Sequence, residues 1–204
     1  ADKLLDITTK IKNVIEKISK IITSLRTFAS EKDLTEFEKI SVTKLIEETT
    51  IFCMNRFQNQ KVDLRSIVDN DFQIECQVKQ MIQVLLNLLN NSFYAIQNSS
   101  NAWIEIKALK HTDFAEITVT DSGSGIAKEI QEKIMQPFFT TKDIGEGTGL
   151  GLSTSQGIVH NHQGRLFYDS VSKNTKFVIQ IPYDQSQTQV IDLSTHRKAN
   201  QSIA

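Results

Sequence analysis

All eight glycines of this 204-residue chain lie between Gly123 and Gly164, and the first 122 residues contain none. Glycine allows positive φ angles and lets the backbone approach a ligand closely, because it carries no Cβ atom. This uneven distribution differs from that of a chain whose glycines occur in ordinary turns along its whole length. We therefore expect the glycine-rich region to contain a loop that is built around a ligand.

The composition excludes several classes of protein. The 23 Lys and Arg residues nearly balance the 24 Asp and Glu residues, so the net charge of -1 gives no reason to expect a nucleic-acid partner. The longest apolar runs are too short to span a bilayer. Cys53 and Cys76 are too few for a disulfide framework and match no metal-ligand spacing, so we expect buried, reduced thiols. Such thiols favour a cytoplasmic location, with any membrane anchor of the full-length protein outside this segment.

Apolar residues recur at alternating spacings of three and four through residues 1–30. This heptad pattern predicts a long amphipathic helix with an apolar seam. We expect the seam to pair with another helix or with a second copy of the chain, because a long exposed seam is unfavourable. Packing against the globular part of the same chain is the alternative. The seam consists of Leu4, Ile7, Ile11, Val14, Ile18, Ile21, Leu25 and Phe28.

The rest of the chain alternates between helical and strand patterns. Ser41 is a suitable N-cap for a helix whose apolar face includes Leu45, Ile46 and Phe52. Helices and mostly antiparallel strands in this order predict an α+β fold, in which helices cover one face of a mixed sheet. The expected strands are 37–40, 61–68, 72–76, 102–110, 114–120, 165–169 and 175–181, and the expected helices follow Ser41 and span 77–97 and 150–162, the last with His160 and His162 at its exposed end.

Two polar clusters stand beside apolar segments. Asn87 and Asn91 lie four residues apart in an apolar helix and share one face, where their amide oxygens could hold a hydrated Mg²⁺ ion. Hydrogen bonding within the helix is the alternative. Asp121 ends a strand and is followed by Gly123 and Gly125, so its carboxylate could accept a hydrogen bond from a ligand amine. A plain glycine turn is the alternative there.

Two further clusters precede the last helix. Phe138 and Phe139 could anchor a lid from which Lys142 reaches a phosphate, or they could form a hydrophobic contact beside a solvated lysine. Glycines at every second position of 145–151 run into a helix, so free backbone amides could bind an anion, with a glycine hinge as the alternative. No Gly-Lys-Ser/Thr follows and no strand precedes, so this cluster is neither a Walker motif nor a dinucleotide fingerprint.

Taken in order, the four clusters resemble the ATP-binding domain of two-component sensor histidine kinases, within the GHKL superfamily shared with gyrase, MutL and the heat-shock chaperone ATPases. Residues 87–92 match the N box, 121–126 the G1 box, 137–139 the F box and 147–152 the G2 box. The short lid is most similar to that of nitrogen-regulator-type sensors. The resemblance implies a two-layer α/β sandwich of the Bergerat type preceded by a long heptad helix. The implied domains are a dimerisation and phosphotransfer helix (1–32), a catalytic ATP-binding domain (33–183) and a flexible tail (184–204).

The resemblance also implies a role for each matching residue. Asn91 would bind Mg²⁺ with help from Asn87, and Asp121 would accept a hydrogen bond from the adenine amino group. Asn87 and Lys142 would take part in catalysis, with Lys142 at the triphosphate. The residues implied to bind ATP are Asn87, Asn91, Asp121, Gly123, Gly125, Ile126, Phe138, Phe139, Thr141, Lys142, Gly147, Thr148, Gly149, Leu150, Gly151, Leu152 and Thr175.

One position separates kinases from hydrolases in this superfamily. Hydrolases place a glutamate base four residues before the metal-binding asparagine, and Asn87 stands there in this chain. An amide does not accept a proton at neutral pH, so the site suits holding ATP for another nucleophile, which in histidine kinases is an imidazole. None of the four histidines begins the family's acceptor motif, so we expect the acceptor on a first bundle helix outside this chain, with a histidine elsewhere, as in a split kinase, as the alternative. Tyr94 stands where many relatives carry a basic residue, and Asn174 replaces the usual glycine before Thr175.

The implied activity is that of a histidine protein kinase. The chain would bind ATP and Mg²⁺, form a homodimer through the heptad helix, and donate the γ-phosphoryl group to a histidine. An aspartate of a response regulator would then receive the phosphoryl group. Two alternatives remain open, namely a serine kinase of the anti-sigma type, which shares the superfamily boxes but lacks a bundle helix, and a nucleotide-sensing interaction module without transfer activity.

Overall fold

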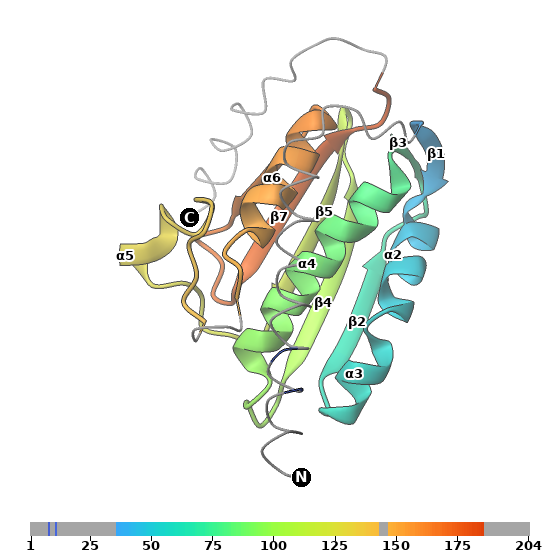
Figure 1. Cartoon of the computed structure of the whole chain (residues 1–204). Helices are drawn as coiled ribbons and strands as arrows, with labels where there is room; N and C mark the ends of the chain where they lie inside the picture. Colours follow the sequence, from blue (N-terminus) through green and yellow to red (C-terminus); the bar gives the residue numbers. More distant parts are fainter. Residues whose placement is uncertain (1–7, 9–10, 12–35, 143–146, 186–204) are drawn as a thin grey trace, which may run out of the picture.

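The computed structural model describes residues 8, 11, 36–142 and 147–185 (Figure 1). Thr8 and Ile11 are both helical, and the other residues of the heptad segment predicted at 1–32 lie outside the described residues. The same holds for residues 186–204 of the predicted tail. The dimerisation helix and the tail therefore stay predictions, whereas most of the predicted catalytic domain can be compared with the structure.

The described residues form a series of helices and strands that begins at Glu38. In chain order these are β1 (Glu38–Ser41), α2 (Val42–Ile51), α3 (Met54–Asn59), β2 (Asp63–Val68), β3 (Gln73–Cys76), α4 (Val78–Ile96), β4 (Trp103–Lys110), β5 (Phe114–Asp121), α5 (Lys128–Gln131), α6 (Gly151–Asn161), β6 (Arg165–Tyr168) and β7 (Lys176–Pro182). Within the described residues, none of these helices is both long enough and apolar enough to cross a membrane.

Five strands form a mixed sheet in the order β2-β4-β5-β7-β6. β2 and β4 run parallel, and the other neighbours in this sheet are antiparallel. Helices α2, α4 and α6 lie on one face of the sheet, and α5 stands to one side of it (Figure 1). The predicted layer of helices on one face of a mixed sheet is confirmed. The strands predicted at 37–40 and 72–76 pair with each other as β1 and β3 and form a separate two-stranded sheet.

The hydrophobic core lies between α4 and the central strands of the sheet. Leu88 of α4 is fully buried, and β4 buries alternate residues that include Ile104 and Ile106. Burial of each large aliphatic side chain stabilises the fold by about 1.5–3 kcal/mol. Because this apolar contact fixes α4 against the sheet, the half-buried Asn87 and Asn91 are held on a rigid helix.

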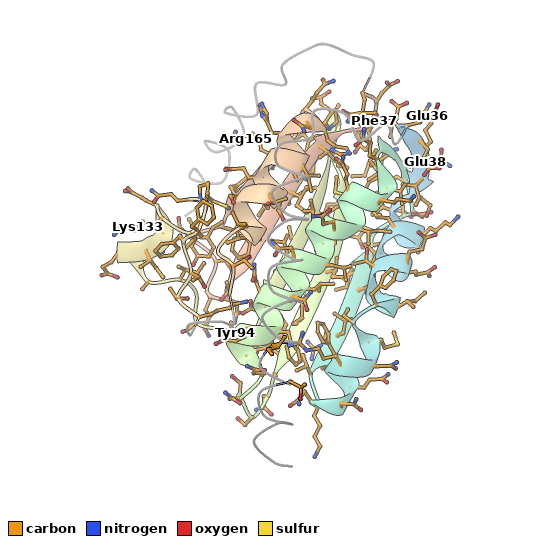
Figure 2. The ribbon with its side chains drawn as sticks, viewed as in Figure 1. Glu36, Phe37, Glu38, Tyr94, Lys133 and Arg165 are labelled. Carbon is orange, nitrogen blue, oxygen red and sulfur yellow. The ribbon has the colours of Figure 1, made fainter. Side chains whose placement is uncertain are left out.

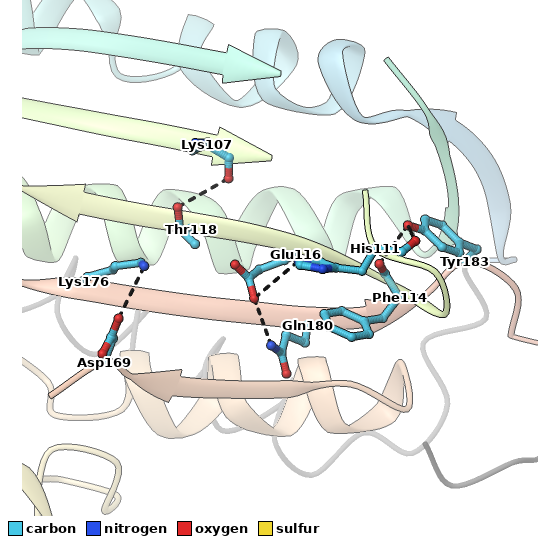
Figure 3. Close-up of polar contacts among 9 residues, drawn as sticks. All are labelled: Lys107, His111, Phe114, Glu116, Thr118, Asp169, Lys176, Gln180 and Tyr183. Atoms are coloured by element: carbon cyan, nitrogen blue, oxygen red, sulfur yellow. Dashed lines mark hydrogen bonds and ion pairs between the residues drawn. The ribbon is translucent and has the colours of Figure 1, made fainter. Parts of the chain in front are cut away.

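The opposite face of the sheet carries polar contacts between neighbouring strands (Figure 3). Lys176 Nζ lies 3.3 Å from Asp169 Oδ2, and Gln180 Nε2 donates a hydrogen bond to Glu116 Oε2 at 2.9 Å. The Tyr183 hydroxyl lies 2.7 Å from each of two carbonyl oxygens, those of His111 and Phe114 at the two sides of the β4–β5 turn, and its one proton is shared between them. These contacts help to fix β7 between β5 and β6. They lie on the face of the sheet that the helices do not cover.

Several local predictions can be compared with the structure. Ser41 is the N-cap of α2, and its hydroxyl accepts a hydrogen bond from a backbone N–H of the first turn at 3.1 Å. Cys53 and Cys76 are buried free thiols, as predicted. The placement of Phe52 on the apolar face of this helix is wrong, because α2 ends one residue earlier and Phe52 is 71% exposed.

His162 is also placed wrongly by the sequence analysis, because its side chain is fully buried. The Gln77 N–H donates to His162 Nε2 at 3.0 Å, and His162 Nδ1 lies 2.8 Å from the Ile158 carbonyl oxygen. Both ring nitrogens therefore have partners in the neutral imidazole, with the proton on Nδ1. Phe37 packs edge-on against the ring, with 5.1 Å between ring centres. Burial lowers the pKa of His162, whereas His160 is exposed as predicted.

Candidate functional site

A cavity of about 600 Å³ lies between α4, the end of β5 and the segments on both sides of residues 143–146. Every residue that the sequence analysis assigned to ATP binding lines this cavity, with the exception of Gly123, Phe138 and Leu150. The four sequence clusters thus meet at one place, although about 65 residues separate the first from the last. The cavity is large enough for a small-molecule ligand of ordinary size.

The three exceptions support the cavity wall from outside. The Gly123 N–H donates to Asp121 Oδ1 at 2.8 Å, and a Cβ atom at Gly123 would lie 2.7 Å from the same oxygen. Leu150 is buried as the N-cap of α6. The side chain of Phe138 is 65% exposed, whereas that of Phe139 is half-buried and lines the cavity. Of the two phenylalanines that were predicted to hold a lid, the structure therefore brings only Phe139 to the cavity.

One end of the cavity presents a buried carboxylate. Asp121 is the last residue of β5 and is 1% exposed, and Thr175 is buried beside it in the cavity wall. Burial raises the pKa of Asp121, and the hydrogen bond from Gly123 offsets part of that effect. Gly125 has a φ of 91°, a conformation that glycine adopts without strain. This end can accept a hydrogen bond from a ligand amine.

The other end of the cavity combines amides with a cation. The Lys142 ammonium donates to Asn91 Oδ1 at 3.2 Å and lies 4.4 Å from the centre of the Tyr94 ring. Asn87 Nδ2 donates to Ser155 Oγ at 3.1 Å. Figure 2 shows Tyr94 on the C-terminal half of α4, on the side of the segment that connects β5 with α6. An anionic group of a ligand would therefore meet Lys142 and the amide side chains of α4 here.

Close backbone contacts place the start of α6 at this same end. Gly149 has a φ of 68°, and a Cβ atom there would overlap the backbone of Phe138. A Cβ atom at Gly151 would overlap Asn87 Oδ1. A larger residue would therefore not fit at either position without a shift of its neighbours. The absence of a side chain at Gly151 lets the first turn of α6 pack against α4. Unpaired N–H groups at a helix N-terminus favour anions, which adds to the effect of Lys142.

Several lining residues were not identified from the sequence. Asn90, Tyr94 and Ala95 follow the same helical face as Asn87 and Asn91, so the periodicity of α4 could have identified them. No sequence signal connects Arg56 of α3 with this cavity. The lining residues that the sequence did not assign to ATP binding are Arg56, Asn90, Ser92, Tyr94, Ala95, Ile130, Ile134, Thr140 and Phe177, of which Asn90 and Ser92 lie within the N box and Tyr94 follows it.

The fold and the cavity together define an α/β domain with a ligand-sized cavity beside α4. The family described as histidine kinase-, DNA gyrase B- and HSP90-like ATPase matches residues 76–185, and the chain belongs to this family. Among curated relatives, the signal transduction histidine-protein kinase AtoS of Escherichia coli (strain K12) is 33% identical over 180 residues, which are 87% of this chain and 29% of AtoS. The sensor histidine kinase ZraS of Salmonella typhi is 31% identical over 169 residues, which are 82% of this chain and 36% of ZraS.

Solved structures give the same result. The catalytic domain of histidine kinase ThkA matches with a TM-score of 0.67 and 31% identity, over 74% of this chain and 97% of that domain. A crystal structure of ThkA in complex with the response regulator protein TrrA matches with a TM-score of 0.72 and 25% identity, over 89% of this chain and 52% of that chain. The predicted fold and the predicted family are confirmed, and the chain is a histidine-kinase-type ATPase domain.

Proposed function

We propose that this chain is the catalytic part of a two-component sensor histidine kinase, which binds ATP with Mg²⁺ and donates the γ-phosphoryl group to a histidine outside this chain. The observation that carries this proposal is that one cavity brings together the buried Asp121 carboxylate, Lys142 and the amides of α4. ATP has the matching groups, because its adenine donates hydrogen bonds and its triphosphate is anionic. The catalytic domain would span 33–183.

In this arrangement the adenine amino group donates to Asp121, and Thr175 lies beside the base. The triphosphate extends toward Lys142 and the first turn of α6. Asn91 Oδ1 fits a metal ion, because it already accepts a hydrogen bond from the Lys142 ammonium and therefore faces a cation. Mg²⁺ bound there would neutralise charge on the phosphate oxygens. Asn87 is fixed by its hydrogen bond to Ser155 and is positioned to assist Asn91.

The described residues of the cavity wall supply no general base for water at the triphosphate, which favours transfer to an external nucleophile over hydrolysis. Asp121 is the only carboxylate among the described lining residues, and no histidine is present among them. In this proposal the Asp121 carboxylate is occupied by the adenine amino group. Apart from Asp121, the polar side chains among the described lining residues are amides, hydroxyls and cations, which do not deprotonate water at neutral pH. The site can position the γ-phosphate and stabilise its charge, and the nucleophile then comes from another chain segment.

The remaining parts of the proposal concern the full-length protein, because this chain spans only 29% of AtoS and 36% of ZraS. The heptad segment at 1–32 would form the homodimer interface and belong to the bundle that carries the acceptor histidine. A response-regulator aspartate would receive the phosphoryl group next. The support for that partner is the solved complex of ThkA with its response regulator.

A phosphotransfer assay tests this proposal. This chain would be mixed with Mg²⁺, γ-labelled ATP and a separately produced two-helix fragment that carries the acceptor histidine of a related kinase. We expect label on the fragment that survives base and is lost in acid, as phosphohistidine behaves, and no label on a fragment whose acceptor histidine is replaced by glutamine. Acid-stable label would indicate a serine kinase instead. Nucleotide binding without any transfer would indicate an interaction module.

A further inference from the structure

Arg56 is a second cation at the cavity, and it comes from a helix that the sequence analysis did not predict. The guanidinium Nη1 donates to Asn90 Oδ1 at 3.2 Å, and Cζ lies 4.2 Å from the centre of the Phe93 ring. Both partners belong to α4. These two contacts hold an otherwise exposed arginine head against the helix that carries Asn87 and Asn91.

The position of α3 explains how Arg56 reaches this place. Phe57, the next residue, is 1% exposed and stacks on Phe93 with 4.9 Å between ring centres and 5° between ring planes. This buried aromatic pair anchors the short helix to α4. Arg56 lies beside the anchor and contacts the same Phe93 ring from an exposed position. The packing of Phe57 on Phe93 therefore determines where the Arg56 guanidinium lies.

The charges at the cavity are arranged in a specific way. Among the described lining residues, Arg56 and Lys142 are the only lysine or arginine, and they bond to the neighbouring amides of Asn90 and Asn91. Both cations thus contact neighbouring residues in one turn of α4. Arg56 has five N–H donors in all. Within the described part of the chain its hydrogen bond to Asn90 is the only one it makes, so donors remain for a ligand.

We infer that Arg56 binds the terminal phosphate of the nucleotide and makes this cavity prefer ATP to ADP. This inference rests on the proposed function, because it requires the triphosphate to lie along α4. A guanidinium matches the geometry of a phosphate group with two parallel hydrogen bonds, whereas an ammonium acts as a point charge. Lys142, together with a metal ion held by Asn91, would contact the phosphates near Asn91, and Arg56 adds a contact for which ADP lacks the group.

Calorimetric titration of the whole chain tests this inference. The nucleotides are ADP and a non-hydrolysable ATP analogue, each with Mg²⁺, and the variants are Arg56→Gln and Arg56→Lys. The matched control is Arg65→Gln, because Arg65 is also exposed, also lies over an aromatic ring (5.6 Å from the centre of Trp103), and is outside the cavity. Thermal unfolding of each variant is measured in parallel to show that it is folded.

Arg56→Gln should weaken binding of the ATP analogue by about tenfold, as expected for the loss of a charge-assisted contact, and change ADP binding less than about twofold. Arg56→Lys should keep part of the preference for ATP, and Arg65→Gln should bind both nucleotides as the parent chain does. Equal weakening of both nucleotides, or no change in a folded Arg56→Gln variant, would overturn the inference and leave the proposed function intact. A parent chain that binds neither nucleotide would overturn both.

Discussion

The Lys142 ammonium lies 3.2 Å from Asn91 Oδ1, so the oxygen proposed to hold Mg²⁺ already accepts a hydrogen bond from a cation. Lys142 also lies over the Tyr94 ring, 4.4 Å from its centre, which gives the ammonium a second favourable position within reach. A metal ion that binds to Asn91 would compete with Lys142 for this oxygen. Lys142 would then be released toward the phosphate groups, where its charge is needed.

Asn91→Ala should abolish the effect of Mg²⁺ on ATP binding, because the variant lacks the amide oxygen that would hold the ion. The measurement is titration of the ATP analogue with and without Mg²⁺. Asn98→Ala is the control, since Asn98 is exposed and does not line the cavity. If Asn91→Ala binds with the same Mg²⁺ dependence as the parent chain, the metal ion is held elsewhere.

Asp121→Ala should weaken ATP binding by roughly 1–3 kcal/mol, the cost of leaving a buried hydrogen-bonding group unpaired. It should also remove the preference for ATP over GTP, because the acceptor for the adenine amino group is lost. Competition of both nucleotides against a fluorescent ATP analogue measures this. Asp169→Ala removes a carboxylate outside the cavity that pairs with Lys176, and it should bind as the parent chain does. If Asp121→Ala binds ATP with unchanged affinity, the adenine base does not bind at Asp121.

Substitution of alanine for each of two glycines of α6 should affect ATP binding differently. A Cβ atom at Gly151 would overlap Asn87 Oδ1, so Gly151→Ala should force α6 or Asn87 to move and weaken ATP binding by about tenfold or more. Gly157 has no atom near its Cβ position. Gly157→Ala should leave binding unchanged and raise the free energy of unfolding by about 0.5–1 kcal/mol through helix propensity. Equal binding by the two variants would contradict the close contact of α6 with α4.

His162 should make the stability of this protein depend on pH. Its pKa is lowered in the folded protein, while the unfolded chain takes up a proton near pH 6.5. The stabilisation is therefore complete above about pH 6.5 and is lost as the pH falls from there through the lowered pKa of the folded state. His162→Ala should unfold more easily by about 2–4 kcal/mol at pH 8, because it leaves the Gln77 N–H unpaired and removes a buried ring.

Urea unfolding at pH 8 and at pH 5.5 measures this effect. The difference in unfolding free energy between the parent chain and His162→Ala should narrow at the lower pH, because only the parent chain loses the contribution of His162. His160→Ala is the control, since His160 lies on the same helix and is exposed. A difference that stays constant between the two pH values would show that His162 does not titrate differently on folding.

The heptad segment makes a separate prediction about assembly. Ile11→Lys combined with Ile18→Lys places two charges in the apolar seam and should convert a dimer into a monomer, because buried unpaired charges oppose helix pairing. Light scattering coupled to size-exclusion chromatography gives the molecular mass. An unchanged mass would mean that the helix packs within its own chain. ATP binding should be the same in both proteins, since both residues lie outside the sequence clusters that are assigned to ATP binding.

The regular elements of the domain could be predicted because their periodicity is strong. The helix expected at 77–97 is α4, Val78–Ile96, and the hairpin expected around residues 111–113 is β4–β5. Helix α3 has only six residues, too few for a period to be recognised. Arg56 was missed with it, because its contact with Asn90 joins positions 34 residues apart and leaves no local pattern.

The two wrong placements have different physical origins, namely the end of a helix for Phe52 and a tertiary contact for His162. The apolar spacing before Phe52 continues beyond the point where α2 ends, so the spacing alone extended the face too far. His162 follows an exposed helix end, but the backbone N–H of Gln77, 85 residues away, satisfies its second nitrogen and allows burial. Most residues that the family resemblance assigned to the site line one cavity, because four clusters in fixed order restrict the fold more than any single pattern does.

Titration calorimetry with ADP and a non-hydrolysable ATP analogue, each with and without Mg²⁺, tests the central claim most directly. The claim is that the cavity between α4 and α6 is one site for ATP and Mg²⁺. We predict that one molecule of either nucleotide binds per chain, and that Mg²⁺ strengthens binding of the triphosphate. Absence of binding in a folded protein, or binding that Mg²⁺ does not affect, would contradict the account.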